Sequence, residues 1–195
     1  MADARRRRPA GPPAAEARGR SGGVGRPSSA AAEQVSNDLR RGAGELLDRR
    51  RRTATLSLVA AGAMGAVAAY QNGVLRRLPE PPLPFLDAER VDASGAAYEL
   101  LRTPDASLGL LSYAATLALA GMGSKDRFLD TPIVPIALAG KVLFDAVGGL
   151  YLTAEQATKH RKFCSWCLTA SIASLVMIPQ VIPEARLALR HLRKR

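Results

Sequence analysis

Both cysteines of the chain lie in one short stretch, RKFCSWCLTASI, at residues 161–172. Two residues separate Cys164 from Cys167, with basic residues before the pair and mostly apolar residues after it. Two thiols with this spacing at the start of a helix can close an intramolecular disulfide and open it again. The helix N-terminus and the nearby Arg161 and Lys162 favour the thiolate, which is the reactive form in thiol–disulfide exchange. The pattern therefore predicts a redox-active dithiol.

Two other uses of a cysteine pair fit the sequence less well. A structural zinc site needs four ligands, and the further candidates are His160 and His191, of which His191 lies in the opposite tail. A purely structural disulfide would join two neighbouring positions, so its benefit from loop closure would be small. We therefore predict redox chemistry without a metal. Because a long apolar segment follows the pair, the electron carrier that we expect is lipid-soluble, namely a quinone.

The elements that position this pair follow from the hydropathy of the chain. Four segments are long and predominantly apolar, at residues 53–75, 106–123, 131–153 and 163–181. About 20 apolar residues in a helix cross the ~30 Å hydrocarbon layer of a membrane. In a chain with only 5% aromatic residues, four such segments separated by charged links predict an all-α, integral membrane four-helix bundle. Pro179 and Pro183 are expected to mark the end of the last helix.

The net charge of +11 does not indicate a nucleic-acid-binding protein, because the excess charge lies in the two tails. Residues 1–52 hold 13 arginines and six acidic residues, and residues 184–195 hold five basic residues and one acidic residue. The charges of the stretch between them cancel. We therefore expect membrane lipid, and no nucleic acid, around the body of the chain.

Composition divides the chain into three parts: a tail at 1–52, a membrane domain at 53–185 and a basic tail at 186–195. The first 30 or so residues mix Arg, Pro, Gly, Ala and Ser without periodicity. Such a segment cannot bury enough apolar surface to offset the entropy lost on ordering, so we predict a disordered basic tail. From Ala31 to Arg52 the sequence predicts a polar helix near the membrane surface.

Basic residues that flank the spans predict the orientation in the membrane. They favour both termini in the cytoplasm, and we expect the membrane to be a bacterial inner membrane. This topology puts the proline-rich loop at 76–104 and the cysteine pair together on the outer side.

Three stretches, taken in order along the chain, carry a resemblance to a known family. They are ERVDAS at 89–94, TPDASLGLLSY at 103–113, with Gly109 and Tyr113 suitably spaced, and FCSWCLTAS at 163–171. With four apolar segments and a long loop between the first two, they resemble the vitamin K epoxide reductase family. The resemblance covers roughly residues 53–185.

The resemblance implies a four-helix bundle around a quinone, covered by the outer loop. In that scheme Cys167 faces the quinone and Cys164 exchanges with an upstream thiol. Asp105 matches the residue that orients the quinone in the family, although it is also placed to cap the second helix. Ser94 would lie in the loop that covers the quinone, or would cap a short helix over GAAYELL.

The chain also departs from the family pattern. The family's relay cysteines are missing from residues 76–104, and one of those positions falls near Ala88. We therefore expect a thioredoxin-like thiol protein of the outer compartment to exchange directly with Cys164, which must then be accessible to water on that side. Ser171 stands where some relatives carry an aromatic hydroxyl, which favours a generic quinone over vitamin K itself.

These observations lead to two alternatives for the function. The first is a membrane thiol–disulfide oxidoreductase that couples the CxxC disulfide to quinone reduction, with Cys164 and Cys167 as catalytic residues. Asp105, Ser94 and Ser171 are then the candidate quinone-binding residues. The second is a non-enzymatic membrane scaffold or interaction protein with a remnant structural cysteine pair.

Lys141 and Asp145 lie four residues apart within the third apolar segment, so on a helix their side chains meet. Charges inside a membrane are costly and often functional. We nevertheless expect a self-neutralising pair that faces the interior of the bundle.

Overall fold

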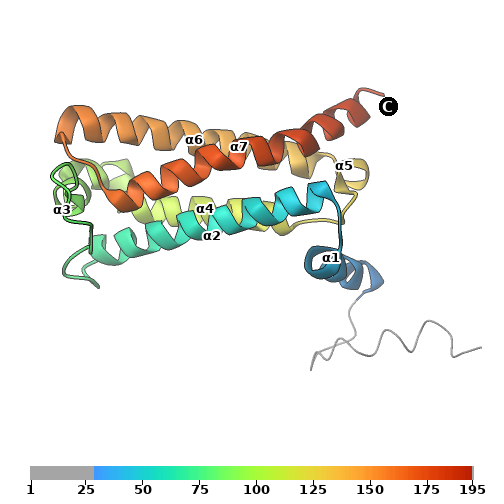
Figure 1. The fold of residues 1–195 in the computed structure, drawn as a ribbon, viewed down its shortest axis with the longest axis horizontal. Coiled ribbons are helices and arrows are strands. Elements are labelled where there is room, and N and C mark those ends of the chain that lie inside the picture. The colour runs from blue at the N-terminus through green and yellow to red at the C-terminus, as the bar shows by residue number, and fades with distance from the viewer. Residues whose placement is uncertain (1–28, 195) are drawn as a thin grey trace, which may run out of the picture.

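The computed structural model describes residues 29–194, and the elements in this range are helices without a strand. Four long helices lie side by side and give the molecule its elongated shape (Figure 1). They are α2 (Glu45–Gln71), α4 (Asp105–Gly121), α6 (Ile133–Glu155) and α7 (Ser165–Leu192). The shorter elements are α1 (Ala30–Arg41), α3 (Ala88–Asp92), the 3-10 turns η2 (Gly95–Tyr98) and η3 (Leu100–Arg102), α5 (Arg127–Asp130) and the π-helical turn η4 (Gln156–His160).

Three of the four long helices are long and apolar enough to cross a membrane, namely α2, α6 with η4, and α7. The fourth, α4, has 17 residues and a length of about 26 Å, which is at the lower limit for a span. That α4 also spans the membrane remains a prediction. It packs closely on α2, because a Cβ at Gly109 would lie only 3.1 Å from the sulfur of Met64.

The last helix continues beyond the two prolines that were expected to end it, so that prediction is wrong. A proline has no N–H, so Pro183 leaves the carbonyl of residue 179, one turn earlier, without its helical donor. In the structure Arg49 Nη1 donates to that carbonyl at 3.0 Å. Beyond the prolines α7 buries Glu184, Ala185 and Ala188, so packing on its neighbours stabilises the extra turns.

The predicted polar helix from Ala31 to Arg52 is not continuous, because α1 ends at Arg41 and α2 begins at Glu45. At Gly42 a Cβ would lie 2.5 Å from the carbonyl oxygen of Asp38, and Gly44 has φ of 135°, which a side chain disfavours. The two glycines therefore turn the chain between the helices. The predicted disorder of the first 30 or so residues falls almost entirely outside the described residues.

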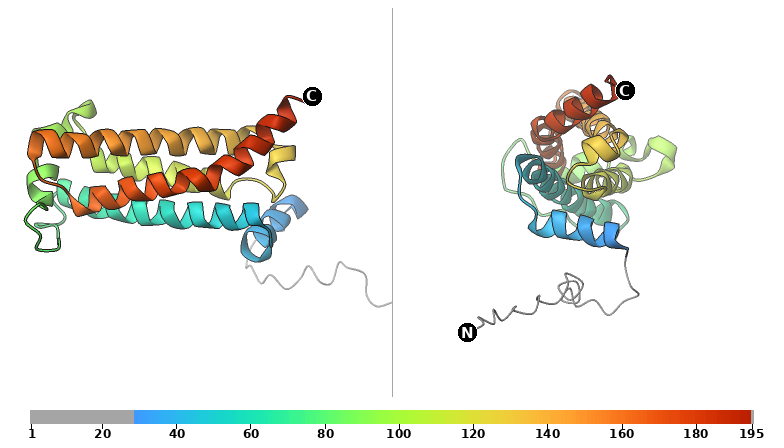
Figure 2. Two further views of the ribbon diagram at one scale, coloured as in Figure 1. Left: turned by 45° about the horizontal axis from the view of Figure 1, so that its top comes forward. Right: turned by 90° about the vertical axis from the view of Figure 1, so that its right-hand side faces the viewer.

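The short elements gather at the two ends of the bundle (Figures 1 and 2). One end holds α1, α5 and the C-terminal end of α7. The opposite end holds α3 and the start of α7 with its two cysteines. The loop at 76–104 and the cysteine pair therefore lie at the same end, as the sequence predicted.

Candidate functional site

The two cysteines form the N-terminus of α7. Cys164 is the N-cap residue, and its sulfur accepts a hydrogen bond from the Cys167 N–H at 3.3 Å. Gln156, in the turn after α6, accepts the Cys164 N–H through Oε1 at 3.0 Å. Both thiols are free in the structure, and the two sulfurs lie within 4.8 Å of each other. The arrangement suits the closing and opening of a disulfide.

The outer loop lies over this helix start and is fixed to it by backbone contacts. The carboxylate of Glu80 accepts the Ser165 N–H at 2.6 Å with one oxygen and the Ala88 N–H with the other. Trp166 Nε1 donates to the Pro79 carbonyl at 3.0 Å. Ala88, where the family's relay cysteine falls, is buried below the surface of this loop.

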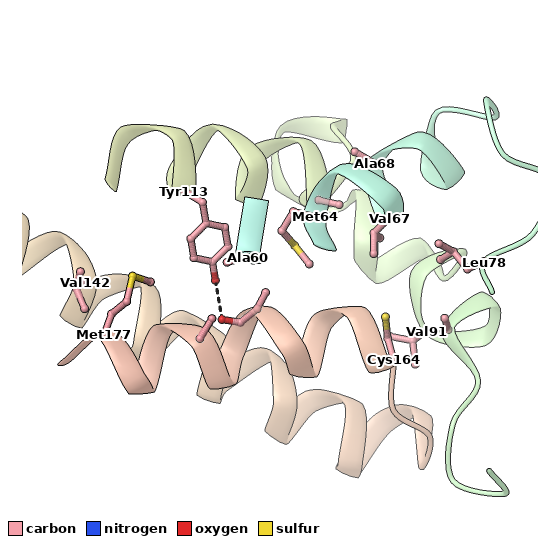
Figure 3. Close-up of a cluster of buried hydrophobic side chains, with 14 of the residues drawn as sticks. Ala60, Met64, Val67, Ala68, Leu78, Val91, Tyr113, Val142, Cys164 and Met177 are labelled. Atoms are coloured by element: carbon pink, nitrogen blue, oxygen red, sulfur yellow. Dashed lines mark hydrogen bonds between the residues drawn. The ribbon is translucent and has the colours of Figure 1, made fainter. Parts of the chain in front are cut away.

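Cys164 is 0% exposed in the structure, so the expectation that it is open to water on the outer side is wrong. Figure 3 shows it at the start of α7, next to Val91 from the loop. Cys167 is half-buried. The reason is that the loop segment 79–92 folds back onto Cys164, whereas Cys167 borders an open space within the bundle.

That space is a cavity of about 170 Å³ between α2, α4, α6, α7 and the loop. Since one water needs roughly 10–15 Å³ by this measure, the cavity has room for about ten waters or a ring of comparable size. Four of the five predicted site residues border it, namely Cys167, Asp105, Ser94 and Ser171. Cys164 does not. Other lining residues include Met64, Val91, Asp92, Gly109, Ser112, Tyr113, Asp145, Gly149, Glu155, Gln156 and His160.

Asp105 is the first residue of α4, and its side chain borders the cavity. Its Oδ1 accepts a hydrogen bond from Gln71 Nε2 at 2.7 Å. Gln71 in turn accepts the Ala106 N–H through Oε1, at 3.2 Å. The amide of Gln71 thus makes hydrogen bonds to the first turn of α4 and holds the carboxylate of Asp105 at the cavity. Gln71 ends an apolar helix, and no local pattern predicts this role for it.

Ser94, from the loop, and Ser171, from α7, both border the cavity. Ser94 is the N-cap residue of η2, as the alternative had it, but its side chain makes no capping hydrogen bond; its Oγ donates to the Val91 carbonyl at 2.7 Å. Ser171 Oγ donates to the Gly149 carbonyl at 3.1 Å. A Cβ at Gly149 would lie 2.8 Å from Ser171 Oγ, so glycine permits this close approach of α6 and α7.

Asp92 is a site residue that the sequence analysis missed, although it lies within the quoted stretch ERVDAS. It is 2% exposed and borders the cavity, and its Oδ1 accepts a hydrogen bond from Cys167 Sγ at 3.4 Å. Burial raises the pKa of Asp92 to about 6, although the nearby thiols of Cys164 and Cys167 oppose the rise. An aspartate within a polar loop carries no sequence signal that distinguishes it from a solvated one.

Lys141 and Asp145 form the predicted ion pair, with Nζ at 2.6 and 2.7 Å from the two carboxylate oxygens. Asp145 is buried, and Ser112 and Thr116 of α4 donate to its carboxylate at 2.7 and 3.0 Å. The expectation of a self-neutralising pair that faces the interior is confirmed. The pair also joins α4 to α6 at the border of the cavity.

The residues that could hold a metal ion in the described part of the chain are Asp92, Cys164 and Cys167, whose donor atoms lie within 4.8 Å of one another. Three donors are one fewer than a structural zinc site uses, although they equal the number in catalytic zinc sites. The absence of a metal therefore remains a prediction.

The comparison with known proteins agrees with this geometry. The model of the vitamin K epoxide reductase family matches residues 51–182, which is more than half of the chain and contains the loop, the cavity and both cysteines. Among curated proteins, none matches the chain. The chain therefore belongs to the vitamin K epoxide reductase family.

Proposed function

We propose that this protein passes electrons from the Cys164–Cys167 dithiol to a membrane quinone, as a quinone-linked thiol–disulfide oxidoreductase. Membership in the family supports an oxidoreductase kind of reaction, and the apolar helices support an integral membrane protein. The proposal adds to this a quinone as the substrate that accepts the electrons.

One observation carries it: Cys167 borders a cavity that also holds Asp105, Ser94 and Ser171. A quinone ring in this cavity lies beside a sulfur atom and beside polar groups for its carbonyl oxygens. Its apolar tail can leave between helices toward lipid. A cysteine pair with only a structural role does not require a cavity next to the sulfur.

The direct test is quinol formation by the purified protein in detergent, with dithiothreitol and a short-tailed quinone. We expect turnover by the wild type and none by Cys167→Ser. A matched control is Ser165→Ala, which changes a hydroxyl in the same helix turn outside the cavity. If the wild type gives no turnover, the remnant cysteine pair of a membrane scaffold becomes the better account.

We also propose that a thioredoxin-like protein of the outer compartment supplies electrons to Cys164. Because the loop covers Cys164, the partner must first displace segment 79–92 from the start of α7. Cys167→Ser protein should then trap the partner through a reducible bond, and trap more of it when Glu80→Ala loosens the loop. Protein that lacks both cysteines is the control. If neither single nor combined variant traps a partner, the electrons come from another source, while the quinone reaction stands.

For the orientation, we propose that both termini lie in the cytoplasm of a bacterium. Tags at residue 20 and at the C-terminus should report the cytoplasm, and a tag near Pro82 should report the outer side. Opposite locations for the two termini would require an odd number of spans and would contradict the four-helix bundle.

A further inference from the structure

Asp92 has the geometry of a group that exchanges a proton with the reacting thiols. Its carboxylate accepts a hydrogen bond from Cys167 Sγ at 3.4 Å, and the donor atoms of Asp92, Cys164 and Cys167 all lie within 4.8 Å of one another. Asp92 also borders the cavity proposed for the quinone. Asp92 therefore contacts the sulfur that must lose a proton and also borders the space where a proton is needed.

The second oxygen of this carboxylate is buried and has no hydrogen-bond partner within residues 29–194. A buried carboxylate oxygen without a partner costs free energy that a neutral side chain would avoid. The loop therefore keeps Asp92 at an energetic cost that packing does not explain. An unpaired buried acid beside a reactive group is typical of proton-transfer sites.

The surroundings of Asp92 favour a group that changes its charge near neutral pH. The titratable groups that face it are Cys164 and Cys167 on α7, Asp105 on α4 and Glu80 in the loop. Glu155 and His160 border the same cavity from the end of α6 and from η4. Burial is the largest influence and raises the pKa of Asp92 to about 6. A general base with a pKa near the working pH is well matched to proton transfer.

We propose that Asp92 is a catalytic residue that accepts the proton of Cys167 and passes it to a quinone oxygen in the adjoining cavity. This inference rests on the proposed function. In the step, the Cys164–Cys167 bond forms, both S–H bonds break, and two electrons reduce the quinone to the quinol. The proton of Cys167 reaches one quinone oxygen through Asp92, and the other quinone oxygen takes up one proton in balance for the proton that Cys164 loses.

The first test measures quinol formation between pH 5 and pH 9 for the wild type, Asp92→Asn and Glu89→Gln. Glu89 is an exposed carboxylate on the same short helix, so it is a matched control. General acid–base groups contribute roughly 10²- to 10⁴-fold, and we expect Asp92→Asn to lose a factor in this range. The wild-type rate should fall as the pH drops through about 6, and this fall should be missing in Asp92→Asn. Glu89→Gln should keep both the rate and the pH profile, and Asp92→Glu should recover part of the rate.

A second test does not need a quinone. An aromatic disulfide that releases a coloured thiol reacts with the reduced protein in two phases, and the second phase reports closure of the Cys164–Cys167 bond. Whichever sulfur closes the bond must lose its proton, and both lie near Asp92. We expect the second phase of Asp92→Asn to be roughly 10²-fold slower, at the lower end of the range for a general base. The pH dependence should change in the same way as in the first test.

The outcomes separate the two proposals. If the wild type gives no quinol but closure depends on Asp92, the quinone reaction fails and the proton transfer from the thiol stands. If the wild type gives quinol, and Asp92→Asn keeps the same rate and pH profile in both tests, the role of Asp92 is wrong. If Asp92→Asn does not fold, a wild-type profile without an inflection near pH 6 overturns the proposal.

Discussion

The two ends of the bundle both bury charged side chains, and the end near α5 pairs them. There the fully buried Arg127 donates through Nε and Nη2 to the two carboxylate oxygens of Glu184, at 2.8 and 2.7 Å. Its Nη1 donates to backbone carbonyls at the end of α4. Arg50 of α2 donates to four carbonyls around the same turn. These bonds satisfy carbonyls that a helix end leaves without donors, and they join α2, α4, α5 and α7.

At the opposite end Asp92 and Asp105 lack a cationic partner. Asp92 leaves one buried oxygen unpaired, and Asp105 is held by an amide rather than by a cation. This end contains the cavity and the two thiols. The difference indicates that paired buried charge in this protein joins the helices, as Lys141 and Asp145 do even at the border of the cavity, whereas the acids without a cation lie beside the thiols.

The largest effect is expected at the paired end, from Arg127→Met. The substitution leaves Glu184 as a buried carboxylate without its cation, which typically costs about 3–5 kcal/mol. It also removes donors from the end of α4. We expect a large fall in the melting temperature in detergent, as measured by circular dichroism.

Two further variants test whether Arg127→Met loses stability because Glu184 has lost its cation. Asp48 forms an exposed pair with Arg51 at 2.7 Å, and Asp48→Asn should change stability by about 0–1 kcal/mol. The double variant Arg127→Met, Glu184→Met removes both charges and should recover part of the loss. Equal effects of Arg127→Met and Asp48→Asn would show that the buried pair of Arg127 and Glu184 stabilises this end no more than an exposed pair does.

The second-largest effect is expected at the end of the bundle that holds the thiols. There we expect the stability of the fold to depend on pH. The folded protein raises the pKa of Asp92 from 3.8 to about 6, so the folded state binds this proton more tightly than the unfolded state. At about 1.4 kcal/mol per unit, the shift corresponds to about 3 kcal/mol. This contribution is fully present below about pH 4 and is lost as the pH rises through about 6.

The melting temperature of the wild type should therefore be higher at pH 4.5 than at pH 7.5. In Asp92→Asn this difference should be smaller, and the variant should be at least as stable as the wild type at pH 7.5. A wild type and an Asp92→Asn variant with the same pH dependence would mean that the carboxylate is solvated or paired in the folded protein.

The hydropathy of the sequence was sufficient to predict the four long helices, because each contains an apolar run that few soluble structures would bury. Their ends were harder to predict. Pro179 and Pro183 indicated the end of a helix, but α7 continues because Arg49, 130 positions away, donates to the exposed carbonyl. Such a contact depends on how the helices pack, and no local pattern reveals it.

The residues of the candidate site were also predicted only in part. Cysteine spacing and the resemblance to the family identified Cys167, Asp105, Ser94 and Ser171, all of which border the cavity. The buried state of Cys164 and the position of Asp92 depend on the loop that folds back over α7. Glu80 fixes that loop across 85 positions of sequence, so the sequence alone gave no reason to place Asp92 beside a thiol.

The smallest effect is expected for Asp105→Ala, which compares Asp105 with Asp92 at the end of the bundle that holds the thiols. If Asp105 orients a quinone carbonyl, the loss of one polar contact should weaken quinone binding by roughly 1–3 kcal/mol, or about 5- to 150-fold in Kd. The bundle should stay folded, because Gln71 still accepts the Ala106 N–H and donates to the Asp92 carbonyl. Quinone affinity is measured by titration with a short-tailed quinone, with Trp166 fluorescence as the signal, and helix content is measured by circular dichroism.

A variant that melts much earlier with unchanged quinone affinity would make Asp105 a residue that stabilises the start of α4. In that case Asp92 would be the acidic side chain of this end with a part in the chemistry, and the quinone would be oriented by the hydroxyl groups of Ser94 and Ser171.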